Sequence, residues 1–126
     1  RLYYVCAKSE TRVLFIAYEH VIKRCENACK FHSQLVSNLL QMIAQRASQQ
    51  ANRIYVLSRN SIRKKIMTYL NSIAAEKQTK TVILPMSYTT FAEYLSVDRS
   101  AMMRELKNLA DEGIIERDGK KLRILD

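Results

Sequence analysis

Glycine, proline and tryptophan are scarce in this chain of 126 residues, which has two, one and none of them respectively. So few turn-forming residues argue against a disordered chain and against an all-β sandwich, and we expect mostly helix. No apolar run approaches the length that crosses a bilayer, and no secretory signal is visible at the start. Three cysteines are an odd number in a chain with no sign of export, which predicts reduced thiols in a cytoplasmic protein without a membrane partner.

Acidic residues are also few, since 12 of them stand against 21 lysines and arginines, a net charge of +9. This balance favours a polyanionic partner, either nucleic acid or an anionic membrane surface. The chain has 8 basic and 3 acidic residues up to Leu57 and 13 basic and 9 acidic residues after it, which excludes a polybasic membrane-binding tail. One tight basic group is either a solvated helix face or a phosphate-binding patch. It consists of Arg59, Arg63, Lys64 and Lys65.

Two short runs near the start, residues 3–7 and 12–16, are rich in β-branched and aromatic residues and predict a hairpin. Two strands cannot bury both of their faces, so we expect the other strands of this sheet upstream of Arg1. A short helix is predicted to follow over residues 19–25, where the hydrophobic period becomes helical.

A long helix is predicted over residues 28–57, with a seam of residues at alternating steps of four and three, which is typical of a coiled coil. The seam positions are Val36, Leu40, Ile43, Ala47, Gln50, Ile54 and Leu57. Gln50 is the polar position, which can fix the register of two helices. The alternative is a helix packed on its own domain, but roughly thirty residues exceed the usual globular length, so we expect a homodimer.

A new helix is predicted over residues 59–75 with Ser58 as its N-cap, and a short strand over residues 82–84 ends at Pro85. Two short helices joined by a three-residue turn are predicted next, over residues 87–95 and 99–112. Their caps are Ser87 or Thr89 for the first and Asp98 for the second. This is a helix-turn-helix pattern, in which the second helix enters the major groove of DNA.

Gly113 is predicted to end the second helix, and Asp118-Gly119 forms the turn of a hairpin between residues 114–117 and 122–125. A hairpin in this place is a wing, so the predicted fold class is mainly α (α+β), a long helix followed by a winged helix-turn-helix. An unrelated helical bundle is the alternative, but it does not explain caps, glycine stop and hairpin in this order.

Residues 57–66 and 90–106 resemble the CRP/FNR superfamily of bacterial transcription regulators, at the junction after the dimer helix and at the helix-turn-helix. The resemblance implies the end of a sensor β-roll over residues 1–27, a dimerisation helix over 28–57 and a winged DNA-binding domain over 58–126. It further implies a homodimer that binds a palindromic operator in double-stranded DNA and responds to an effector through an upstream sensor. RNA polymerase is a further candidate partner.

Family members present two arginines five residues apart to guanine edges, and Arg99 and Arg104 match these positions. The planar fork of arginine suits guanine O6 and N7, which lysine does not match. Ser100 stands where the best-known members carry a glutamate, so their operator is not assumed here. Met103 contacts either a thymine methyl group or the core. The residues aligned with phosphate contacts of the family are Ser61, Tyr88 and Thr89, with Arg117, Lys120 and Lys121 in the wing.

Arg1 aligns with the arginine that holds the cyclic phosphate in cyclic-nucleotide binders, but Leu2 replaces the hydroxyl residue that follows it. Residues 46–47 likewise replace the hydroxyl pair of the long helix. Cyclic AMP is therefore disfavoured, the effector is unknown and no cofactor is expected.

The four residues that could in principle hold zinc are His20, Cys25, Cys29 and His32. Their spacing matches no common metal motif, so we expect thiols without a metal. The sequence has no nucleophile with a matching base, no glycine-rich phosphate loop and no carboxylate pair at catalytic spacing, so we expect no enzyme. The alternative to a DNA-binding regulator is a winged-helix module that binds proteins, and the salt dependence of DNA binding distinguishes the two.

Overall fold

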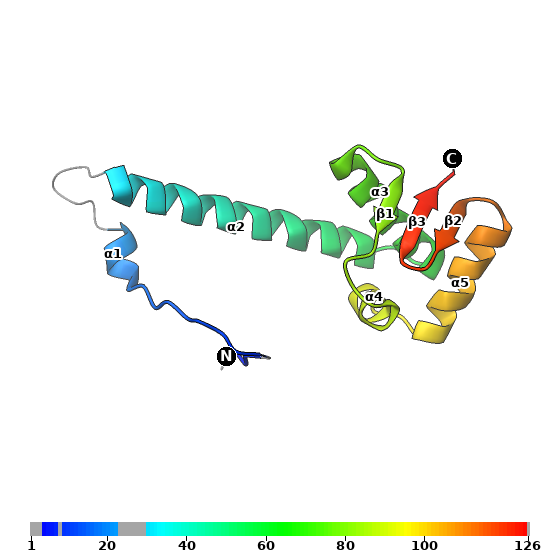
Figure 1. The fold of residues 1–126 in the computed structure, drawn as a ribbon, viewed down its shortest axis with the longest axis horizontal. Coiled ribbons are helices and arrows are strands. Elements are labelled where there is room, and N and C mark those ends of the chain that lie inside the picture. Colours follow the sequence, from blue (N-terminus) through cyan, green and yellow to red (C-terminus); the bar gives the residue numbers. More distant parts are fainter. Residues whose placement is uncertain (1–3, 8, 23–29, 126) are drawn as a thin grey trace. The chain divides into compact units, whose positions relative to one another are not determined.

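The computed structural model describes residues 4–7, 9–22 and 30–125. They form two compact units, Arg1–Gln45 and Arg46–Asp126. The predicted class is confirmed, because the structure is mostly helical with one small antiparallel sheet (Figure 1). The boundary between these two compact units lies inside the long helix, whose last turns pack in the core of the second unit.

The first unit contains helix α1 (Tyr18–Ile22) and the beginning of α2 (Lys30–Leu57). The predicted hairpin is wrong for the described residues, since residues 4–7 and 9–17 form no strand. A pair of strands is marginal in water unless a third strand or a helix covers it. The exposed fractions of Val5 and Phe15 are 100% and 92%, so these side chains gain no burial that would favour a strand.

Every side chain from Leu40 to Ala51 in α2 is exposed. Leu40 and Ile43, two of the predicted seam residues, have exposed fractions of 62% and 64%. A helix packed on its own domain is therefore not what the described residues form over this stretch. The seam itself stays a prediction, because it needs a second chain.

The end of α2 is built into the second unit. Val56 is completely buried in the core, and Asn52 Oδ1 accepts a hydrogen bond from Ser72 Oγ at 3.1 Å. The Arg53 guanidinium lies 5.2 Å from the centre of the Tyr94 ring, within range of a cation–π contact. The last two turns of α2 therefore pack with the winged helices.

Helix α3 (Ile62–Lys77) begins three residues later than predicted, and its N-cap is Ser61. The Ser61 hydroxyl accepts from the backbone N–H of Lys64 at 3.2 Å, as an N-cap does. The prediction of Ser58 as the cap is wrong because Ser58 closes the preceding helix. Its N–H donates to the Ile54 carbonyl and its hydroxyl donates to the Tyr55 carbonyl.

The sheet has the strand order β1-β3-β2 and is antiparallel throughout. Its strands are β1 (Thr81–Ile83), β2 (Ile115–Asp118) and β3 (Lys121–Ile124). The wing is thus confirmed as a hairpin of β2 and β3, but its loop is Gly119-Lys120, one residue later than predicted. Gly119 takes the first loop position with φ +53°, where hairpin loops favour glycine, so Asp118 pairs with Lys121.

The helix-turn-helix consists of α4 (Tyr88–Leu95) and α5 (Arg99–Asp111). Ser87 caps α4, and its hydroxyl accepts from the N–H of Thr90 at 3.1 Å. Asp98 caps α5, and its carboxylate accepts from the N–H of Ala101 at 2.8 Å. Both caps agree with the sequence prediction, in which Thr89 was the other candidate for α4.

One hydrophobic core fills the space between α3, α4, α5 and the sheet. Its completely buried members are Val56, Ile66, Leu70, Phe91, Leu95, Met102, Leu106, Leu109 and Leu122. The Tyr69 ring joins α3 to α4, with its centre 4.9 Å from that of Phe91 and 5.5 Å from that of Tyr94. This core holds α5 by one side.

The two serines at the α2–α3 junction give a direct test of the cap assignment. Ser61→Ala is expected to lower the free energy of unfolding by about 1 kcal/mol, because the N–H of Lys64 loses its acceptor. Ser58→Ala is the matched control, and its exposed hydroxyl donates only to the end of α2. Urea unfolding followed by circular dichroism measures both variants. An effect of Ser58→Ala larger than that of Ser61→Ala contradicts the assignment.

Gly113 ends α5 with φ +72°, a left-handed conformation that costs a residue with a Cβ atom about 1–2 kcal/mol. A Cβ atom at this position would meet nothing within 4 Å, so backbone strain is the whole expected effect of Gly113→Ala. Urea unfolding is expected to show a loss of this size. The reciprocal change Ser96→Gly, at a left-handed residue with φ +51°, is expected to leave stability unchanged or raised. Equal stability of Gly113→Ala and the parent chain contradicts this account.

Candidate nucleic-acid interface

Helix α5 has one buried side and one free side. Met102, Leu106 and Leu109 have no solvent exposure, whereas Arg99 and Arg104 are exposed. Successive helical residues are turned by about 100°, so the two arginines lie about 140° apart: Arg104 is opposite the buried side, whereas Arg99 is about 20° from Leu106 in direction and is exposed in the first turn. The arrangement agrees with the sequence prediction of a groove-facing surface. Contact of these arginines with base edges stays a prediction.

Three other side chains lie on or beside this surface. Ser100 is exposed, so no core contact requires it. Met103 is half-buried and packs against the core, as in the second of its two predicted roles. The sequence analysis missed Lys107, which is exposed and falls between Arg99 and Arg104 in helical angle. Its angle alone could have identified it as a further positive charge on this surface.

The residues predicted to contact phosphate differ in their exposure and in their hydrogen bonds. Thr89 is exposed in the first turn of α4, and Ser61 is an exposed cap whose oxygen already accepts from Lys64. Tyr88 is half-buried, and its hydroxyl donates to the Gly119 carbonyl in the wing loop. Burial raises the pKa of Tyr88, and the positive charge of Arg117 acts against this rise. The hydrogen bond from Tyr88 to Gly119 joins the start of α4 to the wing loop.

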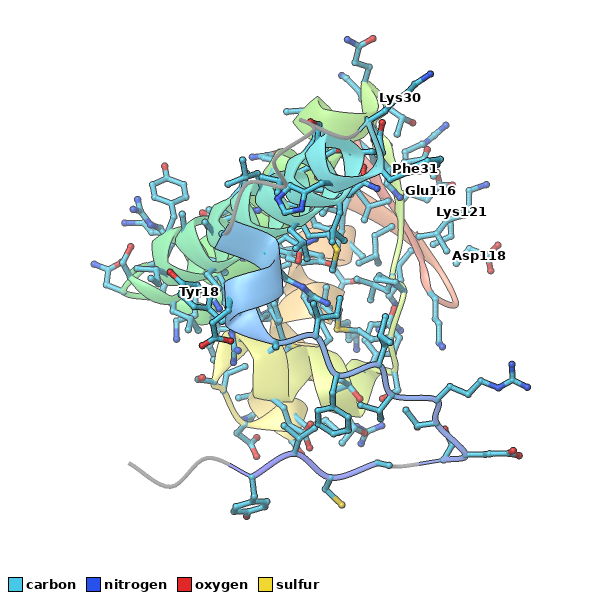
Figure 2. The ribbon with its side chains drawn as sticks, turned by 90° about the vertical axis from the view of Figure 1, so that its left-hand side faces the viewer. Tyr18, Lys30, Phe31, Glu116, Asp118 and Lys121 are labelled. Atoms are coloured by element: carbon cyan, nitrogen blue, oxygen red, sulfur yellow. The ribbon has the colours of Figure 1, made fainter. Side chains whose placement is uncertain are left out.

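The wing presents three exposed cations, Arg117, Lys120 and Lys121. Figure 2 shows Glu116, Asp118 and Lys121 on the hairpin with their side chains pointing away from the body of the winged unit. Glu116 is paired across the strands with Arg123 at 2.9 Å, so that carboxylate is partly neutralised. Arg117, Lys120 and Lys121 are therefore exposed candidates for phosphate contacts, and these contacts stay a prediction.

Of the four cations grouped near residue 60, three contact other groups of the protein and one is exposed to solvent. The Arg59 guanidinium lies 4.1 Å from the centre of the Tyr55 ring, and the Lys65 ammonium donates to the Leu95 carbonyl at 3.0 Å. Arg63 forms ion pairs with two carboxylates of the α5 segment. Lys64 is exposed and makes no side-chain contact within the described residues. The group is therefore not a purely solvated face, and phosphate binding by its exposed member Lys64 stays a prediction.

The two carboxylates that hold Arg63 are Glu112 and Glu105. Their hydrogen bonds, those of Glu112 above all, raise the pKa of Arg63. The hydrogen bonds from Arg63 in turn hold the pKa of Glu112 below its ordinary value. Arg63 and Glu112 are therefore both charged at neutral pH.

The first unit offers an open apolar groove of about 980 Å³. Three of the seam residues line it, Val36, Leu40 and Ile43, beside Ile16, Tyr18 and Val21. The candidate effector residue Arg1 and the cysteines Cys25 and Cys29 lie outside the described residues. Among the residues that are described, no group of His, Cys, Asp or Glu side chains could hold a metal ion. No described helix is both long and apolar enough to span a membrane.

Comparison with known proteins gives three kinds of match. Residues 64–126, half of the chain, match the Crp-like helix-turn-helix domain. The chain is 39% identical over 70 residues to a probable transcriptional regulator, flp, of Lacticaseibacillus casei, which is 56% of this chain and 32% of that protein.

Two solved structures share the fold. FixK2 from Bradyrhizobium japonicum has a TM-score of 0.63 at 21% identity, over 80% of this chain and 52% of that one. A putative regulator of the Crp/Fnr family from Eubacterium rectale has a TM-score of 0.50 at 24% identity, over 72% of this chain and 42% of that one. The chain thus spans from a third to half of the length of these relatives. Since the domain match covers half of the chain and includes α5 and the wing, the protein belongs to the Crp-like helix-turn-helix domain family.

Proposed function

We propose that the protein is a sequence-specific transcription regulator that binds a palindromic operator in double-stranded DNA as a homodimer. The observation that carries the proposal is the exposure of Arg99, in the first turn of α5, and of Arg104, on the side of α5 opposite the core. A helix of this kind fits the major groove, whose width admits one α-helix. The wing cations flank it and supply contacts to phosphate, which fix register without reading bases.

The proposed dimer forms along α2, whose seam side chains are exposed from Leu40 to Ile54. Exposed apolar side chains in a helical row are the surface that a second helix covers in a coiled coil. Two-fold symmetry then presents two α5 helices to two half-sites, about one helical turn of DNA apart (~34 Å). This geometry is the reason for proposing a palindrome.

The effector is proposed to act through a sensor domain upstream of Arg1. Cyclic AMP is disfavoured for the sequence reasons given above, and no cofactor or enzymatic activity is proposed. Effector binding would bias the orientation of the two α2 helices and so the spacing of the two α5 helices. A cytoplasmic location and contact with RNA polymerase are part of the same proposal.

Replacement of Arg99 or Arg104 by alanine tests the proposed contacts with bases. Arg99→Ala and Arg104→Ala are each expected to lower specific binding by about 1–3 kcal/mol and to relax the preference at one base pair. The DNA comes from selection of a randomised duplex pool by the parent chain, and fluorescence anisotropy measures affinity. Arg46→Ala, which removes the same charge from an exposed position of α2, is the control and is expected to keep the preference at every base pair. Unchanged selectivity in both arginine variants would falsify the readout.

The alternative function, a winged module that binds proteins, predicts a different salt response. Each phosphate contact releases counterions, so affinity for DNA is expected to fall steeply as salt rises. If the chain shifts no fragment of a pooled duplex mixture at low salt, that result favours the protein-binding module.

Charges placed on the seam test the dimer separately from DNA binding. Leu40→Glu combined with Ile43→Glu is expected to halve the sedimenting mass to that of one chain, 14.7 kDa, because buried like charges repel across the seam. Gln41→Glu with Ser48→Glu is the control, since both residues are exposed and lie off the seam. A dimer that persists in the seam variant shows that the interface lies elsewhere.

A further inference from the structure

The Arg63 side chain joins two elements of the winged unit that are far apart in the sequence. Its Nε atom donates to Oε1 of Glu105 at 2.5 Å. Its two terminal nitrogens donate to the two carboxylate oxygens of Glu112 at 2.7 and 2.6 Å. Arg63 belongs to α3, Glu105 to α5, and Glu112 is the C-cap of α5. One guanidinium group therefore uses all three of its nitrogen atoms to hold a single helix.

The two carboxylates define a line along one flank of α5. They are seven residues apart, so their side chains point within about 20° of the same direction. A planar guanidinium that meets two such points restricts both the rotation of α5 about its axis and its tilt against α3. Arg104 is the neighbour of Glu105 and is turned from it by about 100°. Any rotation of α5 at Glu105 therefore also turns Arg104.

The ion pairs are not strong contributors to folding. The exposed fractions of the side chains are 38% for Arg63, 22% for Glu105 and 47% for Glu112. Ion pairs with this exposure add little to stability, because water screens them. Their bidentate geometry, in contrast, fixes direction, and the carboxylates occupy the donors that a phosphate would need.

We propose that Arg63 is a positioning residue for DNA reading, which sets the rotation of α5 and thereby the direction in which Arg99 and Arg104 meet the base edges. The inference rests on the proposed function, because it concerns what orients the same reading surface. Arg63 itself touches neither base nor phosphate in this account. Its removal should therefore change selectivity more than overall affinity for DNA.

The test compares affinity for the duplex selected by the parent chain with affinity for a random duplex of equal length. In the full chain, Arg63→Gln is expected to lower the ratio of the two affinities at least about tenfold, the scale of one lost bidentate base contact. Lys64→Gln is the matched control, since it removes the same charge from the next, exposed residue of α3. It is expected to lower both affinities together and to keep the ratio within about twofold.

A second variant separates orientation from charge. Glu105→Gln combined with Glu112→Gln removes two negative charges, so its affinity for random DNA should rise, whereas that of Arg63→Gln should fall. Both variants lose the bidentate ion pair between Arg63 and residue 112, because a glutamine amide has only one acceptor oxygen, and both are expected to lose selectivity. If Arg63 acted only through its charge, the ratio of the affinities for the selected and the random duplex could not fall in both variants. Circular dichroism and thermal unfolding confirm that each variant is folded at the temperature of the assay, and if Arg63→Gln does not fold, the carboxylate variant carries the test.

The outcomes distinguish this inference from the proposed function. If the parent chain is selective and either folded variant keeps the parent's ratio of the two affinities, the positioning role of Arg63 is overturned and the proposed function is not. A parent chain that binds every duplex equally contradicts the proposed function and overturns the positioning role with it. Loss of selectivity in the folded variants, with the ratio unchanged in Lys64→Gln, supports the inference.

Discussion

The winged unit depends on one constraint, the complete burial of one side of α5. Met102, Leu106 and Leu109 are without solvent exposure, and the side chains around them come from α3, α4 and the sheet. Because those elements cover only that side, the opposite arc is free and its direction follows from core packing. The direction of Arg104, on that opposite arc, is thus determined by buried residues on the other side of the helix, and the same packing places the first turn that carries Arg99. Core substitutions that shift α5 should for this reason be felt in recognition as well as in stability.

Two further contacts restrict the position and rotation of α5 more closely than core packing does. The Asp98 cap fixes where the first turn of α5 begins, immediately before Arg99. The Arg63 contact holds the flank of the same helix at two points. Hydrophobic packing is non-directional, so it tolerates small rotations of a helix, whereas caps and bidentate hydrogen bonds have directions. Core, cap and ion pair therefore restrict different motions of one element.

Much of this unit could be predicted from the sequence because its determinants are local. Ser87, Asp98 and Gly113 act on backbone groups within a few residues, and helical periodicity identifies the buried side of α5. The junction was less predictable, since Ser58 and Ser61 both precede a helical pattern and only the hydrogen bonds of α2 decide between them. The pairing of β1 with β3 and the contact between Arg63 and Glu112 join residues 38 or more positions apart. No local pattern marks such contacts.

The use of charge shows why composition could indicate a class of partner but not a site. The excess of +9 suggested a polyanion, yet three of the four cations grouped near residue 60 are engaged by a ring, a carbonyl or carboxylates. The cations that we propose to contact DNA lie on α5 and in the wing, and Lys64 is the exposed member of the group near residue 60. Electrostatic attraction depends on all of these charges at a distance, whereas close contact depends only on donors without a protein partner. A cation that carboxylates of the protein engage, such as Arg63, can therefore contribute to DNA affinity through its electrostatic field, and in our proposal it contributes to specificity through the helix that it holds in place.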